Sequence, residues 1–327
     1  MNTDSGRFPF TKTKAFGYIC ICITVLFFST YEVVNKSIFN RIDPLFVNFL
    51  RFFIGGLFIL PFALKEQREK DIRLTKNDIL SLIIIGGLNV ALSMSLLQLA
   101  IFYGNASLSA LLFSCNPLFV SLFALPLLGE SFDKNKIAGL CLSLIGILVV
   151  FWPGIQGILD TSSNGAGIPL KGFIFPTLAA IVYGLYTALG KKYAASMGSI
   201  IMNAYSFIFG SIILFPFVVI FKGTSAFAMD MSVIPQLIYI SIFVSGLAYI
   251  LYFIGLSLVG AGLGSMVFFI KPVVASVLAA VILGEHISAT HIIGGSLILG
   301  GLAISNFIGR NTRTWEDSKS RHQQKSI

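Results

Sequence analysis

Long apolar stretches alternate with short polar ones along nearly the whole chain. A helix that crosses the hydrocarbon core of a bilayer needs about 20 mainly apolar residues. The candidate stretches are 15–37, 44–64, 79–102, 106–128, 137–152, 171–192, 199–221, 235–258, 261–283 and 290–308. Turn sequences such as RIDP, YGNAS, WPG and VGAG separate them. The pattern predicts an all-α polytopic membrane protein with ten transmembrane helices, and about eight or nine if two stretches are re-entrant.

Composition and charge agree with this fold class. The chain is 56% hydrophobic and 11% charged, whereas a soluble domain is about 25% charged. The net charge of +9 does not indicate a nucleic-acid partner, because most Lys and Arg lie in the tails and connectors. With ten spans, the side that holds both tails carries 17 of these residues and the opposite side carries four. The positive-inside rule therefore predicts cytoplasmic termini in the cell (inner, cytoplasmic) membrane.

The second half of the chain resembles the first. A shift of 155 residues aligns 17–150 with 172–305 without a gap. NPLFVSLFALPLLGE, which begins at Asn116, then matches KPVVASVLAAVILGE, which begins at Lys271. Each half holds five predicted spans, and an odd number forces the second copy to enter the membrane from the opposite face. Such inverted repeats are typical of secondary transporters.

The repeat predicts the domain organisation. It comprises a cytoplasmic tail (1–14), a first five-helix repeat (15–152), an extracytoplasmic connector (153–170), an inverted second five-helix repeat (171–308) and a basic cytoplasmic tail (309–327).

These sequences resemble the EamA family of the drug/metabolite transporter superfamily. The two segments above look like its fourth and ninth helices, and DPLFVNFLRFFIGG, which begins at Asp43, is similar to its second-helix pattern. The resemblance implies a central cavity lined chiefly by helices one, three, four, six, eight and nine. It also implies a metabolite substrate, often exported. The first helix departs from the family pattern, because it reads FFSTYEVVNK where a Trp-Gly-Ser-like segment is common.

Three charged side chains lie within the predicted spans: Glu32, Arg51 and Lys271. Each costs about 2.5–3.5 kcal/mol to insert into a bilayer, so such residues usually face the bundle interior or water. Lys271 lies near mid-membrane, and Pro272 disfavours helical geometry at the residue before it. We expect Lys271 to line the cavity and favour an anion, opposite its repeat mate Asn116. The alternative is an ordinary kink at Pro272, as at Pro117, with Lys271 neutralised by a structural carboxylate.

Glu32 is the sole carboxylate inside a predicted span. It is a candidate for proton coupling or for binding a substrate amine. A fixed ion pair with Lys36 or Arg51 is the alternative, and Arg51 itself is expected to be structural.

Two further pairs occupy matched positions in the halves. Tyr31 and Tyr186 are candidates to face the substrate from opposite sides, although packing alone explains each equally well. Glu130 and Glu285 are expected to hydrogen-bond helix ends or connectors.

These features predict a secondary active transporter that exports a small polar metabolite, an amino acid or a related carboxylate or amine, by alternating access. A channel or a non-transporting membrane scaffold is the alternative. The expected partners are the substrate and the lipid bilayer, possible homodimerisation stays open, and no cofactor or metal is expected. Enzymatic activity is not expected, because His286, His291 and His322 lie at a helix end or in the tail.

Overall fold

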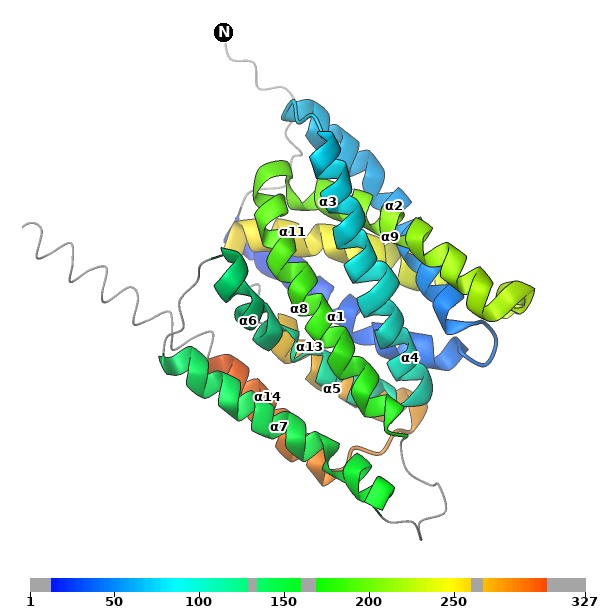
Figure 1. Cartoon of the computed structure of the whole chain (residues 1–327), viewed down its shortest axis with the longest axis vertical. Helices are drawn as coiled ribbons and strands as arrows, with labels where there is room; N and C mark the ends of the chain where they lie inside the picture. Colours follow the sequence, from blue (N-terminus) through cyan, green and yellow to red (C-terminus); the bar gives the residue numbers. More distant parts are fainter. Residues whose placement is uncertain (1–12, 129–133, 160–168, 260–266, 305–327) are drawn as a thin grey trace, which may run out of the picture.

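The computed structural model describes residues 13–128, 134–159, 169–259 and 267–304, and the regular structure in these ranges is helical (Figure 1). The helices of the first half are α1 (Lys14–Ile38), α2 (Pro44–Glu69), α3 (Lys76–Gly86), α4 (Ser95–Tyr103), α5 (Ala106–Phe113), α6 (Asn116–Leu128) and α7 (Lys134–Leu159). Those of the second half are α8 (Lys171–Met197), α9 (Ser199–Lys222), α10 (Ile234–Ile238), α11 (Ala248–Val259), α13 (Val267–Leu283) and α14 (Ala289–Ala303). Short 3₁₀ turns at Gly223–Phe227 and Met231–Val233 precede α10.

Two π-helical segments lie inside apolar helices. Gly87–Met94 joins α3 to α4, and Tyr239–Leu247 joins α10 to α11. Each π-helical segment forms one continuous helix with the two α-helices that it joins. Neither segment was predicted, because a π-bulge has no hydrophobic periodicity of its own.

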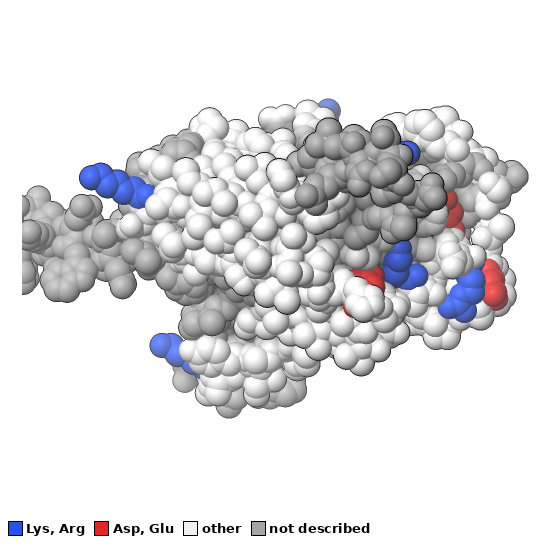
Figure 2. Space-filling view, turned by 90° about the horizontal axis from the view of Figure 1, so that it is seen from below, with Lys and Arg blue, Asp and Glu red and all other residues white. Residues whose placement is uncertain are grey.

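The described surface is that of a membrane protein. Seven helical segments are long and apolar enough to cross a bilayer, and shorter apolar helices span Ile137–Pro153, Ile270–Leu283 and Ala289–Ala303. Large apolar side chains point outward, among them Leu148, Ile220 and Val281 at 64%, 75% and 78% exposure. Figure 2 shows a largely uncharged face with Lys, Arg, Asp and Glu confined to small groups. The chain is therefore a multi-pass membrane protein, since lipid is the solvent that such a surface needs.

Glycines allow close contact between helices that are distant in sequence. Helices α7 and α14 lie side by side at one edge of the molecule, and α2 and α9 lie together at another (Figure 1). A Cβ on Gly146 would lie 2.7 Å from the Gly294 carbonyl oxygen, and a Cβ on Gly301 would meet the Gly139 carbonyl. Such small residues let transmembrane backbones approach each other.

A second pair of glycine contacts holds the π-helical segments. A Cβ on Gly55 would lie 3.0 Å from the Ser241 carbonyl oxygen. Its counterpart in the other half, Gly210, meets the Gly86 carbonyl and the Val90 side chain. The same kind of contact thus occurs in both halves of the chain.

Three sequence expectations about proline differ from the structure. Helix α7 continues through Pro153 to Leu159, so the turn predicted at WPG is wrong. The predicted span 106–128 is interrupted by a turn after Phe113, and α6 restarts at Asn116, although Ala106–Ala124 still forms one apolar segment long enough to cross a bilayer. Pro117 is therefore the second residue of a new helix, where its missing N–H costs nothing.

Pro272 behaves differently from Pro117. It lies inside α13, which stays helical at Lys271, so the expected departure from helical geometry at Lys271 is wrong. Neighbouring groups can compensate for the proline within a transmembrane bundle.

Candidate substrate-binding site

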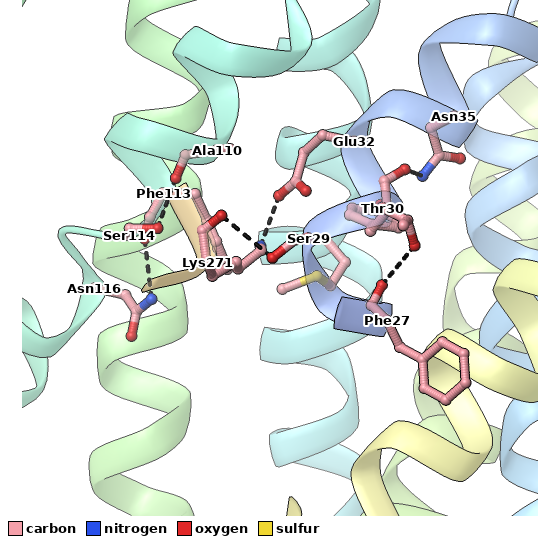
Figure 3. Close-up of polar contacts among 12 residues, drawn as sticks. Phe27, Ser29, Thr30, Glu32, Asn35, Ala110, Phe113, Ser114, Asn116 and Lys271 are labelled. Carbon is pink, nitrogen blue, oxygen red and sulfur yellow. Dashed lines mark hydrogen bonds and ion pairs between the residues drawn. The ribbon is translucent and has the colours of Figure 1, made fainter. Parts of the chain in front are cut away.

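The centre of the site is an ion pair between α1 and α13. Lys271 Nζ donates to Glu32 Oε1 at 2.6 Å (Figure 3). Glu32 is fully buried and Lys271 is 8% exposed. The two residues are 239 positions apart in the chain, so only the fold brings them together. Lys271 is therefore neutralised by a carboxylate, as its alternative interpretation had it, and Glu32 pairs with Lys271 and not with Lys36 or Arg51.

The ion pair leaves one carboxylate oxygen free. Glu32 Oε2 is buried and has no hydrogen-bond partner among the described residues. A buried carboxylate oxygen without a donor is costly. This atom is the part of Glu32 that can accept a further hydrogen bond.

The Lys271 side of the pair faces the break between α5 and α6. Its ammonium lies 5.3 Å from the centroid of the Phe113 ring. Asn116 Nδ2 donates to the Phe113 carbonyl at 2.9 Å, next to the break (Figure 3). Ser29 Oγ on α1 donates to the Lys271 carbonyl at 3.3 Å. Asn116 and Lys271 are thus linked through Phe113, although they share no hydrogen bond that the structure records.

Arg51 on α2 forms the second charged group of the site. It is 3% exposed, and its guanidinium carbon lies 3.9 Å from the Tyr31 ring centroid and 4.2 Å from that of Phe52. Nη2 donates to the Met94 sulfur at 3.5 Å, and a thioether is a weak acceptor. Nε and Nη1 have no acceptor among the described residues.

Tyr31 is held in place by a polar group of its own. Its hydroxyl donates to Gln98 Oε1 at 2.5 Å, and Gln98 Nε2 donates to the Pro44 carbonyl at 3.0 Å. Asn35 Nδ2 donates to the Tyr31 carbonyl at 3.0 Å. Because the hydroxyl is occupied, Tyr31 presents its ring face to Arg51. The sequence reasoning missed Gln98 and Asn35, although amides inside predicted spans were a signal.

Tyr186 contacts an amide of α9 and a second tyrosine of α8. Its hydroxyl donates to Asn203 Oδ1 at 3.0 Å, and its ring lies 5.2 Å from Tyr183. The Tyr183 ring packs 5.1 Å from the Phe113 ring. The Tyr249 ring lies 5.0 Å from Phe207, whose ring in turn lies 4.7 Å from Phe52. These two tyrosines, which the sequence reasoning did not select, reach Lys271 and Arg51 through the rings of Phe113 and Phe52.

The ends of four helices meet above the predicted extracytoplasmic side of this site. The Glu285 carboxylate accepts hydrogen bonds from Ala106 N at 2.7 Å and from Ser107 N at 3.0 Å, which caps α5. Lys36 Nζ donates to the Ile101 carbonyl at 2.8 Å and to the Gly104 carbonyl at 2.7 Å, at the end of α4. The expected helix-end role of Glu285 is confirmed, and Glu130 lies outside the described residues.

A cavity of about 600 Å³ lies elsewhere, beside the α1–α2 connector. Its lining includes Arg41, Asp43 and Asp230. The Ser232 N–H lowers the pKa of Asp230, and Arg41 adds to this effect. This open cavity contains none of the residues of the buried ion pair. Among the described residues, no three His, Cys, Asp or Glu side chains gather as metal ligands.

Comparison with known families decides the classification. The model of the EamA-like transporter family matches residues 15–152 and again residues 170–307. The chain belongs to the EamA-like transporter family. Both matches begin and end within a residue of the repeats expected from the sequence, 15–152 and 171–308.

The EamA-like relatives are transporters by name. An uncharacterized transporter of Clostridium kluyveri is 36% identical over 293 residues, which cover 88% of this chain and 92% of the relative. A probable amino-acid metabolite efflux pump of Salmonella typhimurium is 25% identical and covers 91% of this chain and 97% of that protein. One solved structure shares the fold, with a TM-score of 0.62, 20% identity, and coverage of 91% of this chain and 99% of that one. Family and names indicate a transporter and not an enzyme.

Proposed function

We propose that this EamA-like protein is a secondary active transporter that exports a small polar metabolite across the cell membrane by alternating access. The substrate carries a carboxylate, and an amino acid or a related compound fits the site best. The observation that carries the proposal is the buried pair of Glu32 and Lys271, which lies beside an arginine with unsatisfied donors. The efflux-pump name of the Salmonella relative supports the same substrate class.

An inverted repeat of two five-helix units gives the proposed transporter its two states. The family model matches the chain twice, with both ends offset by the same number of residues. Glycine contacts recur at that offset: Gly146 meets Gly294 while Gly301 meets Gly139, and Gly55 meets Ser241 while Gly210 meets Gly86. Reciprocal contacts of this kind support a two-fold relation between the halves. Such halves allow inward-open and outward-open states of similar energy.

The helix-end contacts suit a closed extracytoplasmic side. Glu285 connects the end of α13 to the start of α5, and Val33, Ala106 and Ala279 form an apolar cluster beside them. In alternating access these contacts break when the site opens outward. The charge asymmetry of the connectors supports a location of this side outside the cell, with both termini in the cytoplasm.

The decisive experiment is counterflow in proteoliposomes. Purified protein is reconstituted, loaded with one of a panel of amino acids, amines or carboxylates, and tested for uptake of the labelled compound from outside. Saturable uptake that accelerates with substrate on the far side supports a carrier. Unsaturable flux without acceleration indicates a channel, and absence of flux across the whole panel contradicts transport of this class.

A further inference from the structure

Arg51 has the properties of an anion-binding side chain, although its place in the sequence suggested a structural role. We propose that Arg51, and not Lys271, binds the carboxylate of the substrate. This inference rests on the transport function proposed above and names the residue that recognises the acidic group.

The two buried cations differ in the acceptors that their N–H groups already have. The Lys271 ammonium already donates to a carboxylate at 2.6 Å. Nε and Nη1 of Arg51 lack an acceptor among the described residues, and Nη2 has only the Met94 sulfur. A buried donor without an acceptor is destabilising. A substrate carboxylate therefore gains more from Arg51 than from Lys271, where it would have to compete with Glu32.

Two aromatic rings lie next to the Arg51 guanidinium. The rings of Tyr31 and Phe52 lie 3.9 and 4.2 Å from its carbon atom. Aromatic rings stabilise a cation through their faces and leave its N–H groups available in the plane. The Gln98 contact at 2.5 Å fixes the Tyr31 ring, and Arg51 is thereby oriented without consuming its donors.

The three buried charges of the site do not cancel. Glu32 and Lys271 neutralise each other, whereas Arg51 forms no ion pair with any described carboxylate. The buried group therefore carries one excess positive charge, which a single carboxylate neutralises. A buried charge is normally paired. Glu32 Oε2 remains as an acceptor for a donor elsewhere on the same substrate, such as an ammonium group.

The test measures carboxylate binding directly. Thermal stability of the purified protein is titrated with acetate and propanoate, and with two matched triads: leucine, 3-methylbutylamine and 4-methylpentanoate, and phenylalanine, phenethylamine and 3-phenylpropanoate. A ligand that binds the folded state raises the melting temperature saturably. We expect wild-type protein to respond to members that carry a carboxylate, and chloride at equal ionic strength to give no saturable response.

Four variants locate the binding residue. Arg51→Gln is expected to weaken the apparent affinity for the responding carboxylates by about 10- to 100-fold, the value of a charge-assisted contact. Arg51→Lys is expected to retain part of the affinity for these carboxylates. The double variant Glu32→Gln/Lys271→Met retains carboxylate binding more strongly than Arg51→Gln, and Arg41→Gln serves as the matched control outside the site. If Arg51→Gln does not fold, the affinities of Arg51→Lys and the double variant decide the question.

The possible failures are distinct. Wild-type protein without a saturable response to any carboxylate overturns the assignment of Arg51, as does loss of carboxylate binding in the double variant but not in the Arg51 variants. Absence of counterflow for every compound contradicts the transport function, while the binding titration still decides whether Arg51 holds an anion.

Discussion

Removal of one charge of the Glu32–Lys271 pair is expected to destabilise the protein more than removal of both charges. Glu32→Gln leaves an ammonium that is 8% exposed, with the Phe113 ring 5.3 Å away as its remaining contact of note. Lys271→Met leaves a carboxylate that is fully buried. The double variant leaves neither charge. Each single change should therefore cost more than the pair of changes.

The distance between the two charges sets the expected size of this loss of stability. At 2.6 Å, two unit charges attract by about 6 kcal/mol when the effective dielectric constant is about 20. Part of this attraction is offset by desolvation of both groups. Breaking a buried pair by removing one partner costs about 3–5 kcal/mol, whereas replacing both by apolar groups is often close to neutral. The double variant keeps one buried amide but no buried charge, so its loss should lie between these limits. A coupling free energy of at least about 2 kcal/mol is expected from the four-member cycle.

Thermal unfolding in detergent, read for wild type, both single variants and the double variant, measures this coupling. The exposed pair of Lys65 and Glu69, 3.7 Å apart with side chains 48% and 55% exposed, provides the matched control. A cycle on that pair should show coupling of at most about 0.5 kcal/mol. Equal coupling in both cycles, or a double variant whose loss equals the sum of the single losses, would refute the reasoning.

Three other changes probe the frame around the site. Glu285→Ala removes the carboxylate that accepts from Ala106 N at 2.7 Å, and it should cost about 1–2 kcal/mol of stability in a melting experiment. Unchanged melting would exclude a stabilising cap. Gly146→Val places a side chain where a Cβ would lie 2.7 Å from the Gly294 carbonyl oxygen, so melting should drop by several degrees while Leu148→Val, 64% exposed, has little effect. Tyr31→Phe leaves Gln98 Oε1 without the hydroxyl that donates to it at 2.5 Å. This change should cost about 1–2 kcal/mol of stability in the same melting experiment. An unaltered melting temperature would show that the hydroxyl does not stabilise the protein.

Hydropathy predicted the helices because the bilayer imposes a simple rule. Each spanning segment must be apolar over a fixed length, so α1 and α9 begin and end within a residue of the predicted limits, and α2 begins at the predicted residue but continues to Glu69. The break between α5 and α6 was not predicted as such. It depends on local hydrogen bonds, such as Cys115 N to the Leu112 carbonyl at 3.2 Å, and apolar composition does not record them.

The charged residues of the site were found by the same rule, but the carboxylate that neutralises Lys271 was not identified. Glu32, Arg51 and Lys271 stand out because charges are rare inside spans. Spacing along the chain made Lys36 one alternative partner of Glu32, beside Arg51, since Lys36 lies one turn later on α1. Lys36 instead donates to the Ile101 carbonyl at 2.8 Å. Tertiary packing decides such choices, and one sequence without the fold does not contain that information.

Comparison of positions 155 residues apart separates the frame from the site. Gly55, Gly139 and Gly146 correspond to glycines at that offset, because close packing of two helices needs a small residue at each reciprocal contact. Glu32, Arg51 and Lys271 correspond to Thr187, Ser206 and Asn116, all neutral. A second set of buried charges would add an insertion cost of about 2.5–3.5 kcal/mol for each residue and would bring like charges together. Small residues are thus kept in both halves where they serve packing, whereas the charges that serve recognition occur once. An oriented, asymmetric substrate needs only one such set.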